Sequence, residues 1–267
     1  MSSSARLWAA LGLCLTVACI EETPLAPRPE MVTVHAVLNP AERVQHVVIT
    51  RESGSGGQMP VRGAAVSLVK PDGATLPATE VTGTSDYEMY LMPGGRYDVA
   101  TSQIEAGRRY RLRVVLPDGR VVEGETTTPS VAPVTVASER LIDRNVDTLR
   151  LSWPRVPGAR AYEVRVFEKR DSLSYYSYGY LTYTDTSFTL AGTARSRGSD
   201  IFIGGFSYDL VVSAVDANYY GYYAFDSDQH TGTALPASLQ GAEGVFGALV
   251  PIVRMSITVA GKDPRLP

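Results

Sequence analysis

The sequence has few of the side chains from which catalytic and metal sites are built. Its 267 residues include two cysteines and three histidines, and the histidines stand apart at positions 35, 46 and 230. No His-Glu-x-x-His or His-x-His spacing occurs, which excludes the familiar kinds of zinc site. His35 and His46 fall in predicted strands and are interpreted as ordinary sheet residues. We therefore expect no metal site and no cofactor.

Phosphate-binding loops and nucleophile motifs are also missing. The glycine-rich stretch at 52–58 lacks the Lys-Ser/Thr pair of a phosphate-binding loop and is interpreted as a hairpin loop. No serine lies in a Gly-x-Ser-x-Gly motif. Asp226 and Asp228 could donate oxygens to calcium, but the rest of a site of about six to eight oxygens cannot be placed. Segment 225–233 is interpreted as a solvated loop, and we expect no catalytic residue.

Positive charge is not concentrated in any part of the chain. The formal net charge is −3, and no basic cluster interrupts the sequence. Because nucleic-acid binding depends on concentrated positive charge, we expect no nucleic-acid partner.

The apolar run LWAALGLCLTVA at 7–18 is too short to cross a membrane, which takes about 20 residues. It follows Arg6 and ends at the small residue Ala18, a pattern typical of a secretory signal peptide. We therefore expect residues 1–18 to be removed. Cys14 would be lost with them, which leaves Cys19 alone and excludes an intramolecular disulfide.

The residues at the cleavage point, Thr16-Val17-Ala18-Cys19, resemble the lipobox of bacterial lipoproteins, with threonine where leucine, valine or isoleucine is usual. The resemblance implies that Cys19 is acylated and that its lipid holds the protein at a membrane. The alternative is an ordinary secreted protein with a cysteine beside its cleavage site. Residues 19–30 contain three prolines and three glutamates and are expected to form an extended tether.

From residue 31 onward, short runs of β-branched and aromatic residues are separated by turn residues. This pattern predicts an all-β protein, and no amphipathic helix is expected. Strands are expected at 32–38, 46–50, 64–69 and 109–116.

The last of these strands has a polar and an apolar face. Tyr110, Leu112 and Val114 alternate with arginines, as in a half-exposed antiparallel strand. The turn at 117–119 reverses the chain and completes a hairpin. Together these elements predict an antiparallel β-sandwich over residues 31–131.

A proline-rich linker at 128–133 separates this region from a second domain, residues 132–267. Residues 147–169 resemble a fibronectin type III domain, with Trp153 as the core tryptophan between the sheets. The resemblance implies a second immunoglobulin- or fibronectin III-like sandwich with a binding or spacer role and no activity. The inward-facing residues would be Leu149, Leu151 and Trp153 on one strand and Tyr162, Val164 and Val166 on the next.

Segments 60–73, 107–133 and 235–259 resemble the surface-associated lipoproteins of Bacteroidetes-type bacteria that carry the domain of unknown function 4249. Chains of that family close on a glycine-rich G-x-F-G-A turn before a last strand. Here the turn would span 244–248 and the strand 255–259. The resemblance implies an outer-membrane lipoprotein, often encoded near TonB-linked receptors.

Tyrosine is concentrated in one part of the chain, because ten of the fifteen tyrosines lie between residues 175 and 223. A tyrosine presents a flat apolar ring with a hydroxyl at its tip, which suits recognition of sugars or protein surfaces. In a strand, neighbouring tyrosines point to opposite faces, so about half would lie in the core. The candidate binding surface is Tyr219, Tyr220, Tyr222 and Tyr223.

These features lead to two functional hypotheses. The first is a non-enzymatic, lipid-anchored cell-envelope protein that presents β-sandwiches for protein–protein interaction, with a TonB-linked receptor of the outer membrane as partner. The second is a surface lipoprotein that binds a glycan or peptide through the tyrosine-rich patch. Both place the protein at the outer membrane, facing either the periplasm or the outside.

Overall fold

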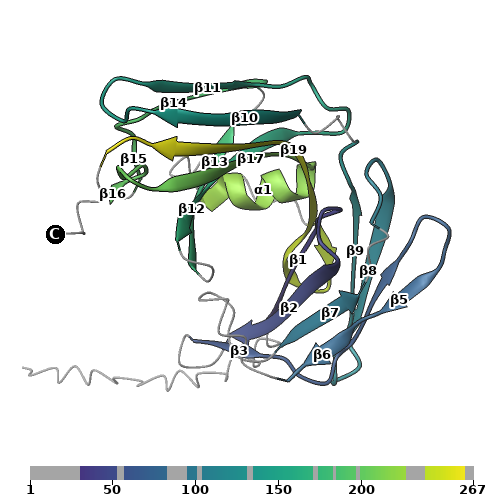
Figure 1. Ribbon diagram of the computed structural model, residues 1–267. Coiled ribbons are helices and arrows are strands. Elements are labelled where there is room, and N and C mark those ends of the chain that lie inside the picture. The colour runs from purple at the N-terminus through teal and green to yellow at the C-terminus, as the bar shows by residue number, and fades with distance from the viewer. Residues whose placement is uncertain are drawn as a thin grey trace, which may run out of the picture.

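The computed structural model consists of β-strands and one helix in the described part of the chain, which confirms the predicted all-β class (Figure 1). No helix among the described residues is long and apolar enough to cross a membrane. The expected signal peptide, Cys19 and the tether lie outside the described residues, as do Asp228 and His230. The structure describes residues 31–52, 57–82, 95–100, 104–130, 135–170, 174–182, 185–196, 199–226 and 238–261.

The N-terminal sandwich has two facing sheets. Its hydrophobic core is built from alternate residues of both, as expected for strands with one buried face. One sheet contains β1 (Val32–Leu38), β2 (Val44–Glu52), β3 (Gln58–Pro60), β6 (Thr79–Val81), β7 (Arg96–Ala100) and the first part of β19 (Glu243–Val259). The other contains β4 (Ala65–Val69), β5 (Thr75–Pro77), β8 (Arg109–Val115), β9 (Val121–Thr127) and β18 (Leu239–Gln240).

The hairpin of β8 and β9 forms as the sequence predicts. Tyr110, Leu112 and Val114 are buried, whereas the arginines between them are exposed. The turn places Gly119 at a φ of 85°, in the left-handed region that glycine enters without strain. The expected strand at 32–38 is β1, and the one at 46–50 lies within β2.

The second sandwich has its own core, in which Trp153 is buried and packs edge-on against Tyr162 with ring centroids 5.3 Å apart. The inward-facing residues predicted from the sequence are all buried there. One sheet contains β10 (Thr135–Ile142), β12 (Ala161–Arg170), β13 (Ser174–Thr182), β17 (Ser207–Val215) and the end of β19. The other contains β11 (Thr148–Ser152) and β14 (Ser187–Ala191), and a hairpin of β15 (Arg195–Ser196) and β16 (Ser199–Asp200) follows.

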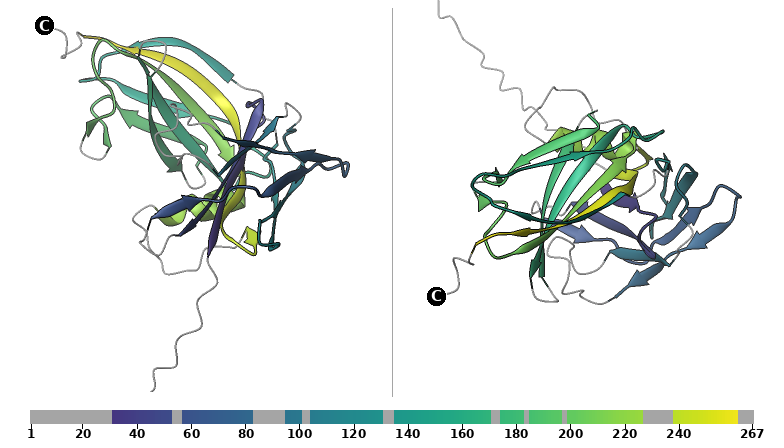
Figure 2. Two further views of the ribbon diagram at one scale, coloured as in Figure 1. Left: turned by 90° about the horizontal axis from the view of Figure 1, so that it is seen from below. Right: turned by 45° about the horizontal axis from the view of Figure 1, so that its top comes forward.

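Strand β19 belongs to both sandwiches. Its first residues pair in parallel with β1, and the rest pairs antiparallel with β17 and in parallel with β10. A continuous 10-stranded sheet therefore runs through the molecule, with β19 as its curved central strand (Figure 2). Two of its pairings are parallel, so this sheet is mixed rather than purely antiparallel.

Two expectations about the C-terminal segment are wrong. Residues 239–248 were expected in the second sandwich, but Leu239, Phe246 and Ala248 belong to the core of the first. The expected turn at 244–248 is instead part of β19. Its glycines allow close backbone approach, because a Cβ at Gly244 would lie 2.0 Å from the carbonyl oxygen of Val34.

Candidate functional site

The four candidate tyrosines lie on a helix, α1 (Ala217–Asp226), and not on the expected strand. Asp216 caps this helix, since its Oδ1 accepts a hydrogen bond from the backbone N–H of Tyr219 at 2.8 Å. The 3.6-residue period then puts Tyr219, Tyr222 and Tyr223 on one side, with the rings of Tyr219 and Tyr223 4.4 Å apart. The cap residue and this spacing were the sequence signals of a helix.

Helix α1 lies at the junction of the two sandwiches (Figure 1). It packs against β19, and a third hydrophobic cluster fills the space around it. We call this cluster the junction cluster. Its members are Ala161, Val215, Tyr219 and Leu249, with Val37, Tyr220 and Tyr223 packed against them.

Tyr219 is a buried structural residue and not part of a surface, because only 2% of it is exposed. Its hydroxyl donates to Glu163 Oε1 at 2.8 Å and accepts from Arg165 Nη2 at 3.0 Å. Arg165 Nε lies 2.8 Å from Glu163 Oε2, which closes a three-membered network. Burial and the adjacent Glu163 raise the pKa of Tyr219. Burial alone would lower the pKa of Arg165, but its interactions with Glu163 and Tyr219 together have the larger effect, so the pKa of Arg165 is also raised.

Tyr223 connects α1 to the first sandwich. Its hydroxyl shares a hydrogen bond with His35 Nε2 of β1, and the His35 ring lies 5.9 Å from that of Tyr222. Burial lowers the pKa of His35 and raises that of Tyr223. At neutral pH the contact therefore joins a neutral imidazole to a neutral phenol. His35 is a sheet residue, as predicted, and it also contacts the tyrosine cluster.

Tyr220 faces another direction, where the guanidinium of Arg160 lies 4.7 Å from its ring centroid. Tyr220, Tyr222 and Tyr223 are all partly exposed. Three of the four predicted tyrosines therefore lie at the junction as partly buried residues, whereas Tyr219 is buried and is not part of a binding surface.

Asp216 also joins the two sandwiches, which the sequence did not indicate. Its carboxylate accepts hydrogen bonds from the Thr126 hydroxyl at 2.5 Å and from the Ala248 N–H at 3.0 Å. Burial raises the pKa of Asp216, and these hydrogen bonds oppose the shift. The side chain of Asn218 extends the connection, because its Nδ2 donates to the carbonyl oxygens of Glu125 at 2.7 Å and Phe246 at 2.9 Å.

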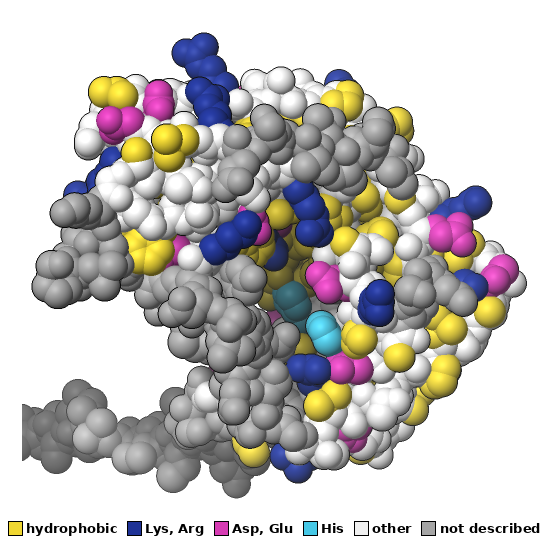
Figure 3. All heavy atoms as spheres, in the orientation of Figure 1, with side chains coloured by type: hydrophobic (Ala, Val, Ile, Leu, Met, Phe, Trp, Pro, Cys, Tyr) yellow, Lys and Arg dark blue, Asp and Glu magenta, His cyan; other side chains and the backbone are white. Residues whose placement is uncertain are grey.

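A hollow opens beside the junction on the face of β1, β2 and β7 that points away from the first core. His35 is opposite Val48 in the β1–β2 register, and His46 shares that face because alternate residues of a strand point the same way. Figure 3 shows the histidine side chains within the hollow, with charged side chains around them. Val48 is buried there, whereas the side chain of His46 is 39% exposed.

His46 belongs to a polar group in this hollow. Its Nδ1 lies 2.7 Å from Asp98 Oδ1, and Arg96 binds the same carboxylate through two hydrogen bonds of 2.8 Å. Burial alone would raise the pKa of Asp98, but the hydrogen bonds from Arg96 and His46 lower it. In the described part of the chain, no three potential metal ligands gather. The hollow offers aromatic rings and paired charges, which suit recognition.

Comparisons with known proteins bear on the family and on the architecture. The family model described as Domain of unknown function (DUF4249) matches residues 20–247. No curated protein matches the chain.

Among solved structures, the chain is similar to the chicken CNTN1 FN1-FN3 domains, with 16% identity and a TM-score of 0.29 over 72% of this chain and 62% of that one. It is similar to DIP-gamma IG1+IG2, with 10% identity and a TM-score of 0.20 over 88% and 99% of the two chains. It is also similar to the BSP domain of a biofilm associated protein, with 13% identity and a TM-score of 0.25 over 89% and 30%. Likenesses of this size say nothing about what the chain binds.

Proposed function

This chain belongs to the family of domain of unknown function 4249, and we propose that it is a non-enzymatic, lipid-anchored protein of the outer membrane that presents two sandwiches as one rigid unit to a TonB-linked receptor. The observation that carries the proposal is the passage of β19 through both sandwiches, next to a junction closed by buried hydrogen bonds. A rigid pair of domains presents a composite surface that neither domain has alone.

Rigidity matters because tandem domains joined by a linker usually move relative to one another. Here the shared strand and the junction cluster oppose such motion. A surface that is already in its binding arrangement loses less entropy when a partner docks. The hollow combines residues of the first sandwich, such as His46, with the aromatic side of α1, and this makes it the preferred docking face.

The anchor is tested by replacing Cys19 with alanine, which removes the thiol that would be acylated. We expect the wild-type protein in the outer-membrane fraction and the Cys19→Ala protein in the soluble fraction. Protease treatment of intact cells then reports which side of the membrane the sandwiches face. Equal membrane retention of both proteins would contradict anchoring through Cys19.

The docking face is tested by site-specific photo-crosslinking in cells. A photoreactive residue at position 46 lies in the hollow, whereas one at position 113 lies on the exposed face of β8, where the side chain of Arg113 is 50% exposed. We expect a covalent adduct with a TonB-linked receptor from position 46 and none from position 113. Absence of an adduct from position 46, or equal adducts from both positions, would contradict the proposal.

The half-exposed tyrosines favour a second candidate function, capture of a glycan or peptide in the same hollow. Tyr222 lies there against His35 and Tyr223, where a ligand could stack on the rings. If this is right, Tyr222→Ala should abolish retention on a polysaccharide array, whereas Tyr222→Phe should keep most of it. Equal retention of wild type and Tyr222→Ala would exclude this function.

A further inference from the structure

Strand β13 forms one end of the 10-stranded sheet. All 9 of its residues pair with β12 in an unbroken antiparallel register. No strand in the described part of the chain pairs with its other edge. In an antiparallel strand, alternate residues direct their N–H and C=O groups to opposite sides. The free edge of β13 therefore carries a row of backbone donors and acceptors that another strand could pair with.

The sequence of β13 lacks the features that usually keep an edge strand from pairing. Proteins protect such edges with charged side chains, proline, bulges or short length. The nine residues SYYSYGYLT include no charged residue and no proline, and the register with β12 has no bulge. The strand is also longer than the usual five or so residues. Its composition thus favours pairing with a further strand.

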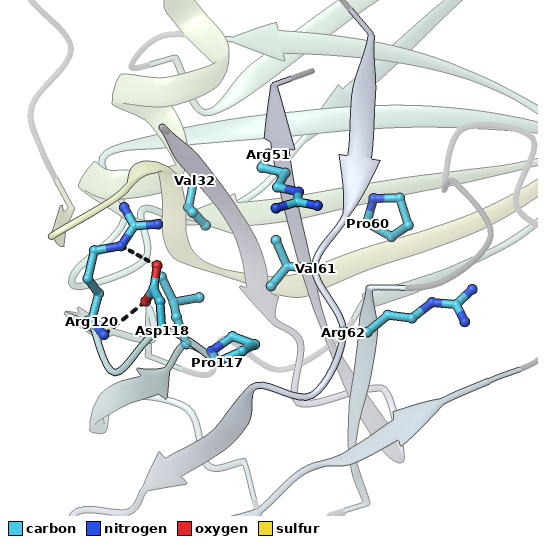
Figure 4. Close-up of a pocket in the computed structure, with 9 residues that line it drawn as sticks. Val32, Arg51, Pro60, Val61, Arg62, Pro117, Asp118 and Arg120 are labelled. Atoms are coloured by element: carbon cyan, nitrogen blue, oxygen red, sulfur yellow. Dashed lines mark hydrogen bonds and ion pairs between the residues drawn. The ribbon is translucent and has the colours of Figure 1, made fainter. Parts of the chain in front are cut away.

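The other edge strands of the 10-stranded and 5-stranded sheets each have at least one protective feature. At the opposite end of the 10-stranded sheet, β6 has only 3 residues and contains Glu80. Strand β3 also has 3 residues and ends at Pro60, which lines the pocket drawn in Figure 4. Strand β5 ends at Pro77, and β18 has only 2 residues. Strand β10 contains Glu139 and Arg140 beside a register shift. Among these edges, β13 alone is long, uncharged and regular.

A second copy of β13 suits this edge, because the strand is complementary to itself. When the whole strand pairs antiparallel with its own copy, Tyr178 lies on the two-fold axis and Tyr176 is opposite Tyr180. On the other face of the sheet, Ser177 is opposite Gly179. Aromatic residues opposite one another stabilise antiparallel pairs, and no pair in this register brings like charges together.

From these observations we propose that two copies of the chain associate through antiparallel pairing of β13 with β13, which joins their two 10-stranded sheets into one. Both copies use the same strand, so the contact has two-fold symmetry and closes at two copies. Growth into a fibre is opposed because the other end of each sheet is the short, charged β6. The dimer goes beyond the proposed function and requires neither the lipid anchor nor a receptor.

The register is tested with pairs of introduced cysteines. The chain from residue 19 with Cys19→Ala contains no cysteine, so a new thiol reports on one contact. In the proposed register, residue 175 of one copy is opposite residue 181 of the other, whereas the two copies of residue 175 are about 20 Å apart. Tyr175 and Leu181 pair with Lys169 and Glu163, which alternate with core residues of β12, so both positions lie on the sheet face opposite the core.

We expect a mixture of the Tyr175→Cys and Leu181→Cys proteins to form a disulfide-linked dimer under mild oxidation, and each protein alone to remain unlinked. Linkage of Tyr175→Cys to itself would indicate parallel pairing and would overturn the proposal. Absence of a link in the mixture would also overturn it.

The edge itself is tested by measuring the molecular mass of the Cys19→Ala chain by sedimentation equilibrium. We expect the mass of two chains at about 0.1 mM. Ser177→Lys brings a positive charge close to the axis in each copy and should weaken the dimer about fivefold. The matched control is Ser152→Lys, which makes the same change at the exposed end of β11 and should dimerise as the parent chain does.

A single-chain mass for the parent, or equal weakening by the two lysine variants, would overturn the proposal. If the parent has a single-chain mass and Ser177→Lys loses a receptor adduct in cells, the edge instead pairs with a strand of another protein, and the dimer is excluded. The mass and cysteine measurements depend neither on Cys19 acylation nor on a receptor, so failure of the dimer is distinguishable from failure of the proposed function.

Discussion

At the residue scale, Asp216 connects three parts of the chain through one buried carboxylate. It caps α1, accepts from the Ala248 N–H of β19, and accepts from Thr126 at the end of β9. Thr126 lies 90 residues away in sequence. A sequence pattern can indicate that an aspartate caps a helix, but it cannot indicate such distant donors, because tertiary folding alone brings them together.

Replacing Asp216 with alanine should destabilise the protein by about 2 to 4 kcal/mol, because it removes a helix cap and leaves buried donors without their acceptor. Asp216→Asn keeps an oxygen acceptor and should cost less than half as much. Urea unfolding of the three proteins at neutral pH measures both differences. Equal losses for alanine and asparagine, or a loss below about 0.5 kcal/mol for alanine, would contradict this role.

The same carboxylate predicts a pH dependence. Because burial raises the pKa of Asp216, the folded protein holds a proton at pH values where the unfolded chain has released it. This contribution to the free energy of unfolding is therefore full below about pH 4 and declines as the pH rises through the raised pKa. Asp216→Asn removes the titrating carboxyl group and with it this pH-dependent contribution to the free energy of unfolding. The wild type should lose stability relative to Asp216→Asn between pH 4 and pH 7, and a constant difference across that range would contradict the assignment.

At the element scale, β8 shows where a sequence pattern suffices, and α1 and β19 show where it does not. The alternation of Tyr110, Leu112 and Val114 identifies a strand because it depends on local periodicity alone. The tyrosines of α1 do not predict a helix, because tyrosine favours strands and the segment is short. Gly244 and Gly247 predict a turn but lie in a strand, since glycine marks both turns and places where another backbone comes close.

Gly247 is the contact point between these two elements. A Cβ at this position would lie 2.8 Å from the backbone nitrogen of Tyr219, so Gly247→Ala forces α1 away from β19. We expect a loss of about 1 to 3 kcal/mol, as for other overpacked sites, and weaker packing of Tyr219. Unfolding curves and the near-UV circular dichroism of the tyrosines report the two effects.

Gly73→Ala is the comparison for this prediction. Gly73 lies in an exposed turn at a φ of 85° with no atom within 4 Å of a built Cβ. Its replacement strains the local backbone by about 1 to 2 kcal/mol and should leave the tyrosine signal unchanged. An altered tyrosine signal in Gly73→Ala, or an unaltered one in Gly247→Ala, would be inconsistent with close packing at Gly247.

At the scale of the whole molecule, two sandwiches with separate cores share a strand and a buried junction. The sequence predicts both cores, because each rests on alternation within strands. The sharing could not be predicted, because nothing local distinguishes a strand that crosses from one sheet to another. The junction brings the tyrosines and the hollow together.

Native-state hydrogen exchange on Leu149→Ala tests most directly whether the two sandwiches form one unit. Leu149 is buried in the second core, so the substitution should cost about 2 to 5 kcal/mol there. If β19 and the junction couple the sandwiches, the amides of β8 in the first sandwich should lose as much protection as those of β17 in the second. Full protection of β8 in Leu149→Ala, with protection lost in β17 alone, would show that the sandwiches unfold independently and would contradict the rigid unit.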